Sequence, residues 1–243
     1  SAVTERIVVG VDVGGPFTDM FFLDEVDGTC EVIKVPTPRE DQSRGIQQGI
    51  ERTLGGLADV ATIVHGTTVA TNALLERKGA QTGLITTRGF RDVLELGRRT
   101  RPNNYGMTGS FEPLIDRELR LEVSERLDAR GRVVTPLDED EVRTALQTHE
   151  SLRADAIVIH FLHAYANPDH ERRAVALLRD IWPNDYITAG HELLSEYREF
   201  ERGVTASLNA SVRPFLHRYV DRLQSELSAK GFRRDLLVMN GNG

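Results

Sequence analysis

The segment Gly10–Asp19, which reads GVDVGGPFTD, gathers residue types that suit phosphate and magnesium. Asp12 ends an apolar run, and the adjacent glycines Gly14 and Gly15 then predict a tight turn. Glycine has no Cβ, so backbone N–H groups at such a turn can approach phosphate oxygens closely. Asp12 lies at the mouth of the turn and is placed to hold a Mg²⁺-bound water, because Mg²⁺ prefers hard oxygen ligands and keeps several waters.

The same segment also allows a simpler interpretation. Thr18 opens the second β-rich run with a hydroxyl able to donate to phosphate, but a β-hairpin with a Gly-Gly turn and a solvent-facing Asp12 needs no ligand. Two glycines alone favour the plain hairpin, whereas the apolar neighbours of Asp12, Val11 and Val13, favour the phosphate site. The segment is not a P-loop, because no Gly-Lys-Ser/Thr follows it.

A second polar cluster occurs in His65–Ala80, which reads HGTTVATNALLERKGA. A strand is expected to lead into it and a helix to begin within it, so that hydroxyls and free N–H groups converge as an anion site. Its polar residues are His65, Thr67, Thr68, Thr71 and Asn72. A local turn, with Thr71 as the N-cap and His65 hydrogen-bonded nearby, explains the same residues, and on spacing alone that alternative is favoured.

Three histidines and a basic run also invite a functional interpretation. His160 and His163 are three positions apart on an expected strand, so their side chains point to opposite faces, and His170 belongs to the next helix. This disfavours a metal triad and favours a structural or cleft role for His163. The basic loop Arg98–Arg101 is interpreted as a solvated charge run rather than a carboxylate or phosphate site.

Alternating strands and helices predict an α/β fold. An antiparallel meander is expected from Ile7–Asp12, Phe17–Leu23 and Cys30–Val35. Later strands are expected at Thr62–Val64, Gly83–Thr86, Leu119–Arg126, Ala156–Phe161, Ile187–Ala189 and Leu236–Met239. Helices are expected at Ser43–Leu57, Thr71–Lys78, Gly89–Leu96, Asp138–His149, from Asn167 and Pro168 (N-cap and first turn) to Ile181, and Phe200–Lys230 with a bend near Pro214.

Composition narrows the functional class. The 243 residues are 40% apolar and 28% charged, as in ordinary globular proteins, and the net charge of −7 argues against nucleic acid or an anionic membrane as the main partner. Cys30 has no second cysteine to pair with, and Ser1–Arg6 shows no signal-peptide pattern, so we expect a cytoplasmic protein. The glycine loop that follows a strand at 240–243 is interpreted as the truncated end of a larger protein.

Together these motifs resemble the N-terminal domain of the hydantoinase A/5-oxoprolinase family, which also includes ATP-dependent acetone and acetophenone carboxylase subunits. The resemblance rests on GVDVGGPFTD and on a longer stretch from His65 to Pro102. It continues through FLHAYANPDHE (Phe161–Glu171) and SEYREFER (Ser195–Arg202), so it covers nearly the whole chain.

The resemblance implies an actin-like ATPase (ribonuclease H-like) fold with ATP and Mg²⁺ as cofactors. It implies an N-terminal domain over residues 1–190 and the truncated start of the main domain, a second lobe, over 191–243. The implied site comprises a phosphate-binding hairpin (Asp12, Gly14, Gly15, Thr18, Asp19), cleft residues (His65, Thr67, Thr68, Asn72) and a second phosphate loop (Gly241, Gly243). Asp12 and His65 are the expected catalytic residues. One position departs from the family pattern, because Pro16 replaces a threonine and lacks a backbone donor.

The implied activity is ATP-driven hydrolysis of a cyclic amide of the hydantoin or 5-oxoproline type, through phosphorylation of the amide oxygen. A B-type subunit or domain is the expected partner. Two alternatives stay open: a subunit of an ATP-dependent ketone carboxylase, which would use the same ATP site, and a nucleotide-switched interaction module that acts on a partner by domain closure.

Overall fold

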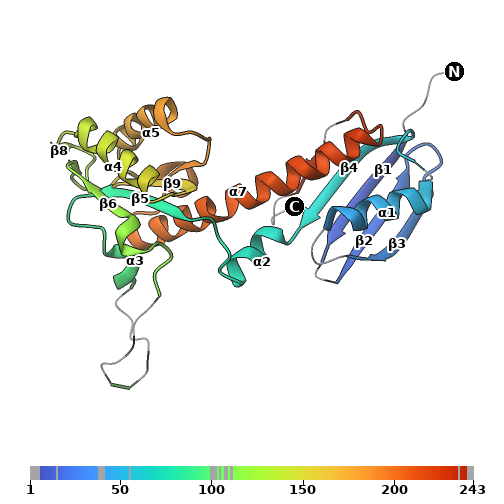
Figure 1. Cartoon of the computed structure of the whole chain (residues 1–243), viewed down its shortest axis with the longest axis horizontal. Helices are drawn as coiled ribbons and strands as arrows, with labels where there is room; N and C mark the ends of the chain where they lie inside the picture. The colour runs from blue at the N-terminus through green and yellow to red at the C-terminus, as the bar shows by residue number, and fades with distance from the viewer. Residues whose placement is uncertain are drawn as a thin grey trace. The chain divides into compact units, whose positions relative to one another are not determined.

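A computed structural model describes residues 6–14, 16–37, 42–54, 56–98, 103, 105–106, 109, 112–234 and 236–239. The chain forms two compact units. Unit 1 comprises Ser1–Leu75 and Phe215–Gly243, and unit 2 comprises Glu76–Pro214. Each unit has its own β-sheet (Figure 1).

Unit 1 begins with the expected antiparallel meander. It consists of β1 (Ile7–Val13), β2 (Phe17–Asp24) and β3 (Cys30–Pro36). The turn between β2 and β3 follows from its sequence, because Gly28 takes a φ of 72° and the Asp27 carboxylate accepts hydrogen bonds from Thr29.

Two parallel strands complete the sheet of unit 1. β4 (Val60–Thr67) pairs with β1, and β11 (Leu236–Val238) pairs with β4, which gives the order β11-β4-β1-β2-β3. The helices α1 (Gln42–Leu54) and α2 (Val69–Leu75) flank β4 in the chain. An antiparallel meander joined to parallel strands agrees with the expected α/β, actin-like ATPase fold.

One face of this sheet carries the core of unit 1. Along β1, residues 7, 9, 11 and 13 are buried, while the alternate residues are partly or fully exposed. Helix α1 and the C-terminal part of α7 (Glu199–Ala229) pack against the buried face. Their contacting side chains are Ile46, Ile50, Leu223 and Leu227.

Unit 2 contains a four-stranded parallel sheet. Its strands are β5 (Thr82–Thr87), β6 (Arg120–Val123), β9 (Ala156–His160) and β10 (Ile187–Ala189), in the order β10-β9-β5-β6. Every residue of β5, β9 and β10 is buried. Such continuous burial is typical of parallel strands covered on both faces.

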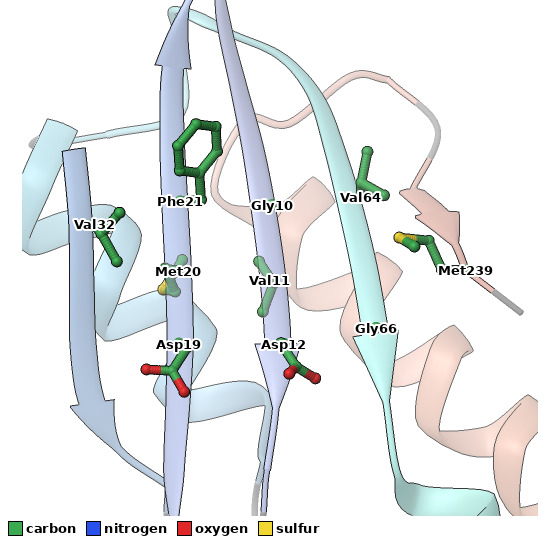
Figure 2. Close-up of a pocket in the computed structure, with 10 residues that line it drawn as sticks. All are labelled: Gly10, Val11, Asp12, Asp19, Met20, Phe21, Val32, Val64, Gly66 and Met239. Carbon is green, nitrogen blue, oxygen red and sulfur yellow. The ribbon is translucent and has the colours of Figure 1, made fainter. Parts of the chain in front are cut away.

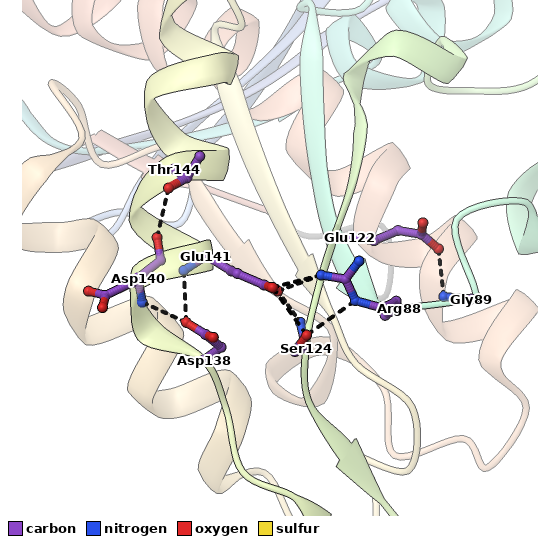
Figure 3. Close-up of polar contacts among 8 residues, drawn as sticks. All are labelled: Arg88, Gly89, Glu122, Ser124, Asp138, Asp140, Glu141 and Thr144. Atoms are coloured by element: carbon purple, nitrogen blue, oxygen red, sulfur yellow. Dashed lines mark hydrogen bonds and ion pairs between the residues drawn. The ribbon is translucent and has the colours of Figure 1, made fainter.

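Helices cover both faces of the sheet in unit 2. On one face lie α4 (Glu139–Ser151) and α5 (Asp169–Ile181), and on the other lie α3 (Val93–Leu96) and the N-terminal part of α7. Figure 3 shows why α4 begins where it does: the Asp138 carboxylate accepts hydrogen bonds from the N–H groups of Asp140 and Glu141 at 3.1 and 3.0 Å.

Several predicted element boundaries were wrong. The expected strand Leu119–Arg126 is divided between the 3-10 helix η1 (Arg117–Leu119), β6 and the short β7 (Arg126–Leu127), which pairs with β8 (Val133–Thr135). Neither β8 nor α6 (Gly190–Leu193) was predicted. Asn167 accepts from the N–H of Asp169, but the cap position belongs to Pro168, because α5 starts one residue later than expected.

The described part of the expected second domain, 191–243, contributes α7 to both units and β11 to the first sheet. A family-domain boundary at residue 190 therefore stays a prediction, since the compact units divide the chain elsewhere. Within the described part of the chain, no helix has the length and apolar character that a membrane crossing requires.

Candidate functional site

Two aspartates lie side by side where β1 and β2 approach their connecting turn. Asp12 and Asp19 are directly opposite each other in the antiparallel register, on the face of the sheet away from the core (Figure 2). The Asp12 side chain is turned toward β4, and the Asp19 side chain toward β3. There the Lys34 ammonium lies 3.0 Å from Asp19 Oδ1. Lys34 is thus the ionic partner of Asp19, whereas Asp12 has no ionic partner among the residues that the structure describes.

A hollow of about 530 Å³ adjoins the two aspartates on the same face. Gly66 of β4 is opposite Asp12, and a Cβ added there would lie 3.5 Å from Asp12 Oδ1, so glycine leaves the carboxylate accessible. The hollow is lined by polar residues at one end and by apolar residues from four strands along its length (Figure 2). The apolar lining includes Phe21, Val32, Val64 and Met239.

The turn between β1 and β2 is closed and anchored by hydrogen bonds of its own backbone groups. The N–H of Gly14 donates to the carbonyl of Phe17 at 3.1 Å, so this donor is used within the hairpin. The carbonyl of Pro16 accepts from the N–H of Thr37 at 2.9 Å, which anchors the turn to the residue after β3. Gly15, predicted to bind phosphate, lies outside the described residues.

Thr18 belongs to the core face rather than to the face with Asp12. Its side chain is fully buried, and its hydroxyl is 2.7 Å from the hydroxyl of Thr37. Side chains alternate along a strand, so Thr18 and Asp19 necessarily point to opposite faces of β2. The structure therefore brings Asp19 to Asp12 but gives the Thr18 hydroxyl a structural hydrogen bond.

The connection between β4 and α2 is tied to the end of β1. The hydroxyl of Thr68 donates to the carbonyl of Val13 at 3.2 Å, and Asn72 Nδ2 donates to the Thr68 hydroxyl at 3.4 Å. The backbone of Thr67 pairs with Val13 as well, while its side chain lies outside the described part of the chain. These residues hold the second polar cluster beside the hairpin that follows Asp12.

His65 is separated from Asp12 by the sheet itself. It is opposite Val11 in the register of β1 and β4, so it shares the buried face, and its side chain is fully buried. Its Nε2 is 2.8 Å from the hydroxyl of Tyr219 in α7. Burial lowers the pKa of His65 to about 4, which keeps the ring neutral. The catalytic role expected for His65 stays a prediction, and this placement suits a positioning role through Tyr219.

The other histidines do not form a cluster. β9 ends at His160, so His163 lies in a turn with a φ of 60° rather than on the strand, and His170 Nδ1 pairs with Glu125 at 2.7 Å. Among the residues that the structure describes, no three His, Cys, Asp or Glu side chains are grouped as a metal site. The expected placement of His163 on the strand, with its side chain on the face opposite that of His160, was wrong, because the strand ends before it.

Some predicted positions cannot be placed. Gly241 and Gly243, expected to form the second phosphate loop, lie outside the described residues, as do residues 99–101 of the basic loop. Arg98 is described, and its Nε is 2.7 Å from Glu201 Oε1 on the exposed surface. This ion pair fits the interpretation of the basic run as solvated charge.

Sequence reasoning missed a buried polar network in unit 2. The Glu171 carboxylate accepts hydrogen bonds from the N–H groups of Phe161 and His191, both at 2.8 Å. The fully buried guanidinium of Arg202 donates to the carbonyls of Phe161 and Glu196, at 2.9 and 2.7 Å. Local spacing carried no signal for these contacts, but the network joins the segments FLHAYANPDHE and SEYREFER, which were singled out only by resemblance.

The sequence of this chain is similar to one protein family and to several curated relatives. The family described as hydantoinase/oxoprolinase N-terminal region matches residues 8–182. An uncharacterized protein of Methanocaldococcus jannaschii is 36% identical over 97% of the chain. The acetophenone carboxylase gamma subunit of Aromatoleum aromaticum is 34% identical and the caprolactamase subunit alpha of Pseudomonas jessenii is 30% identical, each over 97% of the chain. The chain spans 35% of the length of each of these relatives.

Solved structures support the same grouping. The crystal structure of ATP-dependent caprolactamase from Pseudomonas jessenii matches 95% of this chain and 35% of its own, with a TM-score of 0.82 and 30% identity. The nucleotide-free acetone carboxylase structure matches 96% of this chain and 36% of its own, with a TM-score of 0.78 and 28% identity. These matches confirm the expected fold.

Proposed function

Because the chain belongs to the hydantoinase/oxoprolinase family, we propose that it carries part of the ATP site of an enzyme that hydrolyses a cyclic amide. The observation that carries this proposal is the exposed Asp12 carboxylate, which lies beside Gly66 near the end of β1 and has no ionic partner in the described part of the chain. The family's ATP-dependent caprolactamase and 5-oxoprolinases support the choice of substrate class.

Phosphorylation by ATP would make the ring amide reactive, because an amide carbon is by itself a poor electrophile. Transfer of the γ-phosphoryl group to the amide oxygen breaks the bond between the β- and γ-phosphates and turns that oxygen into a leaving group. Water can then add to the ring carbon, and the C–N bond breaks with the nitrogen as leaving group, which opens the ring and leaves an acyl phosphate. A second water hydrolyses the acyl phosphate to a carboxylate and phosphate. ATP, the cyclic amide and two waters are consumed, and ADP, phosphate and the ring-opened acid are formed.

The residues present fit this use in part. Asp12 offers an exposed hard oxygen, and Mg²⁺ is commonly held through one or two carboxylates with several waters. When bound, Mg²⁺ would neutralise charge on the phosphates. Asp19 lies beside Asp12, but Lys34 already offsets its charge. We therefore assign the metal to Asp12, with Asp19 as a neighbouring polar group.

The phosphate-binding residues divide into two kinds. Thr68 and Asn72 hold the β4–α2 connection against the end of β1, and so position the backbone around the turn. Gly14 closes the hairpin turn with its N–H. Direct phosphate contacts are proposed for Gly15 and Thr67 on this side, and for the loop of Gly241 and Gly243. Thr18 and His65 act from the core face, where they support the strands that carry Asp19 and Gly66.

A ketone carboxylase is the second candidate, favoured by the 34% identity with the acetophenone carboxylase gamma subunit. It would activate a ketone through the same ATP site. Relatives that are named as alpha, beta and gamma subunits show that members of this family work in multi-subunit enzymes. We propose a B-type subunit or domain as the partner here, and a cytoplasmic location.

Phosphate release by the complete protein with its partner subunit tests the proposal. Hydantoin, 5-oxoproline and caprolactam are compared with acetone and acetophenone, each ketone with bicarbonate. We expect phosphate release that depends on a cyclic amide and equals the amount of ring-opened product. Release only with a ketone and bicarbonate would establish the carboxylase instead. Phosphate release that no substrate stimulates would argue for a nucleotide-switched module.

A further inference from the structure

Three neighbouring strands of the sheet in unit 2 end at nearly the same level. Thr87, the last residue of β5, is opposite Val123, the last residue of β6. His160, the last residue of β9, is opposite Thr86. Open parallel sheets bind ligands outside the carboxyl ends of their strands, at the point where successive connections leave in opposite directions. In this sheet β5 leads to β6 on one side and β9 leads to β10 on the other, so the ends of β5 and β9 mark that point.

Each of these strand ends is followed, three positions later, by a member of one side-chain cluster. The three residues are Phe90 after β5, Arg126 after β6 and His163 after β9. The Arg126 guanidinium lies over the Phe90 ring, 4.7 Å from its centroid, and is also a near neighbour of the His163 ring. The His163 and Tyr165 rings meet edge to face, with 5.8 Å between their centroids. All four side chains are partly buried, so the cluster is in contact with solvent.

Arg126 is a cation without a protein partner. In the part of the chain that the structure describes, its guanidinium forms no hydrogen bond and no ion pair. Arg88, which directly follows β5, differs in this respect, because it donates two hydrogen bonds to Glu141 at 2.7 and 2.8 Å (Figure 3). A planar guanidinium group matches a carboxylate or a phosphate in a two-pronged contact. The donors of Arg126 are therefore available to such a ligand.

The backbone of His163 is held in an unfavourable conformation. Its φ of 60° lies in the left-handed region, which residues other than glycine rarely adopt. Strain of this kind clusters at ligand sites, where the surrounding structure enforces it. Burial lowers the pKa of His163, and the guanidinium groups of Arg126 and Arg202 lower it further, so the ring is neutral near pH 7. A neutral imidazole can donate one hydrogen bond to a ligand.

The charges around the cluster favour a ligand with one negative charge. The buried Arg202 has the carboxylates of Glu171 and Glu199 near it. Asp128 is held in an ion pair of 2.7 Å by another arginine of the same hairpin. Among the described residues, this leaves Arg126 as the cation whose charge is not offset. A single guanidinium suits a carboxylate better than a phosphate dianion, because the second charge of the dianion would find no partner here.

We propose that Arg126, His163 and Tyr165 form a binding site in unit 2 for a small organic carboxylate with an aromatic or apolar body. Arg126 binds the carboxylate through two N–H donors, and the His163 ring donates a further hydrogen bond to it. The rings of Phe90 and Tyr165 flank the apolar part of the ligand. All these residues belong to unit 2, so the site is separate from the ATP site proposed for unit 1.

Calorimetric titration of the complete protein with benzoate tests this proposal, with benzamide and inorganic phosphate as comparison ligands. We expect saturable binding of benzoate that is about tenfold or more tighter than binding of benzamide, because hydrogen bonds to a charged group contribute at least this factor. Phosphate should bind more weakly than benzoate. Absence of benzoate binding, equal affinities for benzoate and benzamide, or tighter binding of phosphate would each overturn the proposal.

Two arginines of one hairpin provide a matched pair of variants that locates the site. Arg126→Gln should weaken benzoate binding by about tenfold or more. Arg130→Gln removes the same charge from the turn between β7 and β8, where Arg130 is exposed and its side chain has no contact among the described residues. It should change the affinity by less than about twofold, because exposed charges are screened by salt. Equal effects of the two variants would contradict the site.

Two further variants keep the test decisive. Arg126→Lys retains the charge but cannot form the two-pronged contact, so it should weaken benzoate binding several-fold even if Arg126→Gln fails to fold. Unchanged affinity in Arg126→Lys would overturn the proposal. Asp12→Asn changes unit 1 and should leave benzoate binding as it is. Loss of benzoate binding in Asp12→Asn would place the ligand in unit 1 and would also overturn the proposal. Thermal unfolding checks that each variant is folded.

Discussion

The two sheets of this protein differ in how their faces are used. The sheet of unit 2 is parallel throughout, is covered by helices on both faces and lies beside a buried hydrogen-bond network around Glu171 and Arg202. The sheet of unit 1 buries one face and leaves the other with Asp12, Asp19 and a hollow of about 530 Å³. Buried polar groups therefore serve stability in unit 2, while an accessible carboxylate in unit 1 is available for a ligand.

The largest expected effect concerns the exposed carboxylate of Asp12 in unit 1. Asp12→Asn in the complete protein should reduce ATP turnover by about 10²–10³-fold, which is typical for removal of one well-placed electrostatic group. The unfolding temperature should change little, because the side chain is exposed. Steady-state phosphate release and thermal unfolding measure the two effects. Near-normal turnover would return Asp12 to the role of a solvent-facing hairpin residue.

Breaking the buried hydrogen-bond network of unit 2 should destabilise that unit. Glu171→Ala removes the acceptor of one buried and one part-buried backbone N–H group, so it should lower the free energy of unfolding of unit 2 by about 2–4 kcal/mol. Trp182, the only tryptophan, is in unit 2 and reports its urea unfolding by fluorescence. Glu192→Ala is the matched control, because Glu192 is exposed nearby and should shift stability by less than about 0.5 kcal/mol. Equal effects of the two variants would contradict the network.

Buried histidines predict that the two units also differ in their response to acid. Burial lowers the pKa of His149 to about 4 and of His160 to about 3 in unit 2, with Arg202 adding to the effect at His160. Unit 1 has His65, with a pKa of about 4. Because the unfolded state takes up protons first, near pH 6.5, stability should fall as the pH decreases from about 6.5 toward 4, by up to about 1.4 kcal/mol per pH unit for each histidine.

Urea unfolding followed by Trp182 fluorescence at pH 7.5, 6.5 and 5.5 measures the slope for unit 2. His149→Gln should flatten this slope whatever its effect on stability at pH 7.5. A slope that is unchanged in the variant would show that His149 does not titrate as its burial requires.

The smallest expected effect concerns the hairpin turn of unit 1. Pro16→Thr in the complete protein restores a backbone donor next to Gly15, so it should tighten ATP binding by about tenfold and raise turnover. The carbonyl at residue 16 would still accept from Thr37, so the hairpin should keep its anchor. Calorimetric titration of both proteins with ATP measures the change. Equal affinities would mean that the N–H at this position points away from the phosphates.

Local sequence patterns determined much of the architecture. Alternation of apolar residues, the Asp-Gly turn and the Gly-Gly pair predicted β1, β2 and β3, and the same alternation separates Asp12 from its buried neighbours. Asp138 marked the start of α4 through its side-chain cap. These features depend on residues a few positions apart, so composition and periodicity contain the information needed to predict them.

Only the tertiary structure decided which residues meet. His65 and Asp12 are placed on opposite faces by the register of β1 and β4, and Tyr219, 154 residues from His65, occupies the place beside it. Pairing of β11 with β4 likewise brings the two ends of the described chain into one sheet, with unit 2 inserted between them. Strand register and contacts between distant segments depend on packing of the whole unit, and no local periodicity of the sequence encodes them.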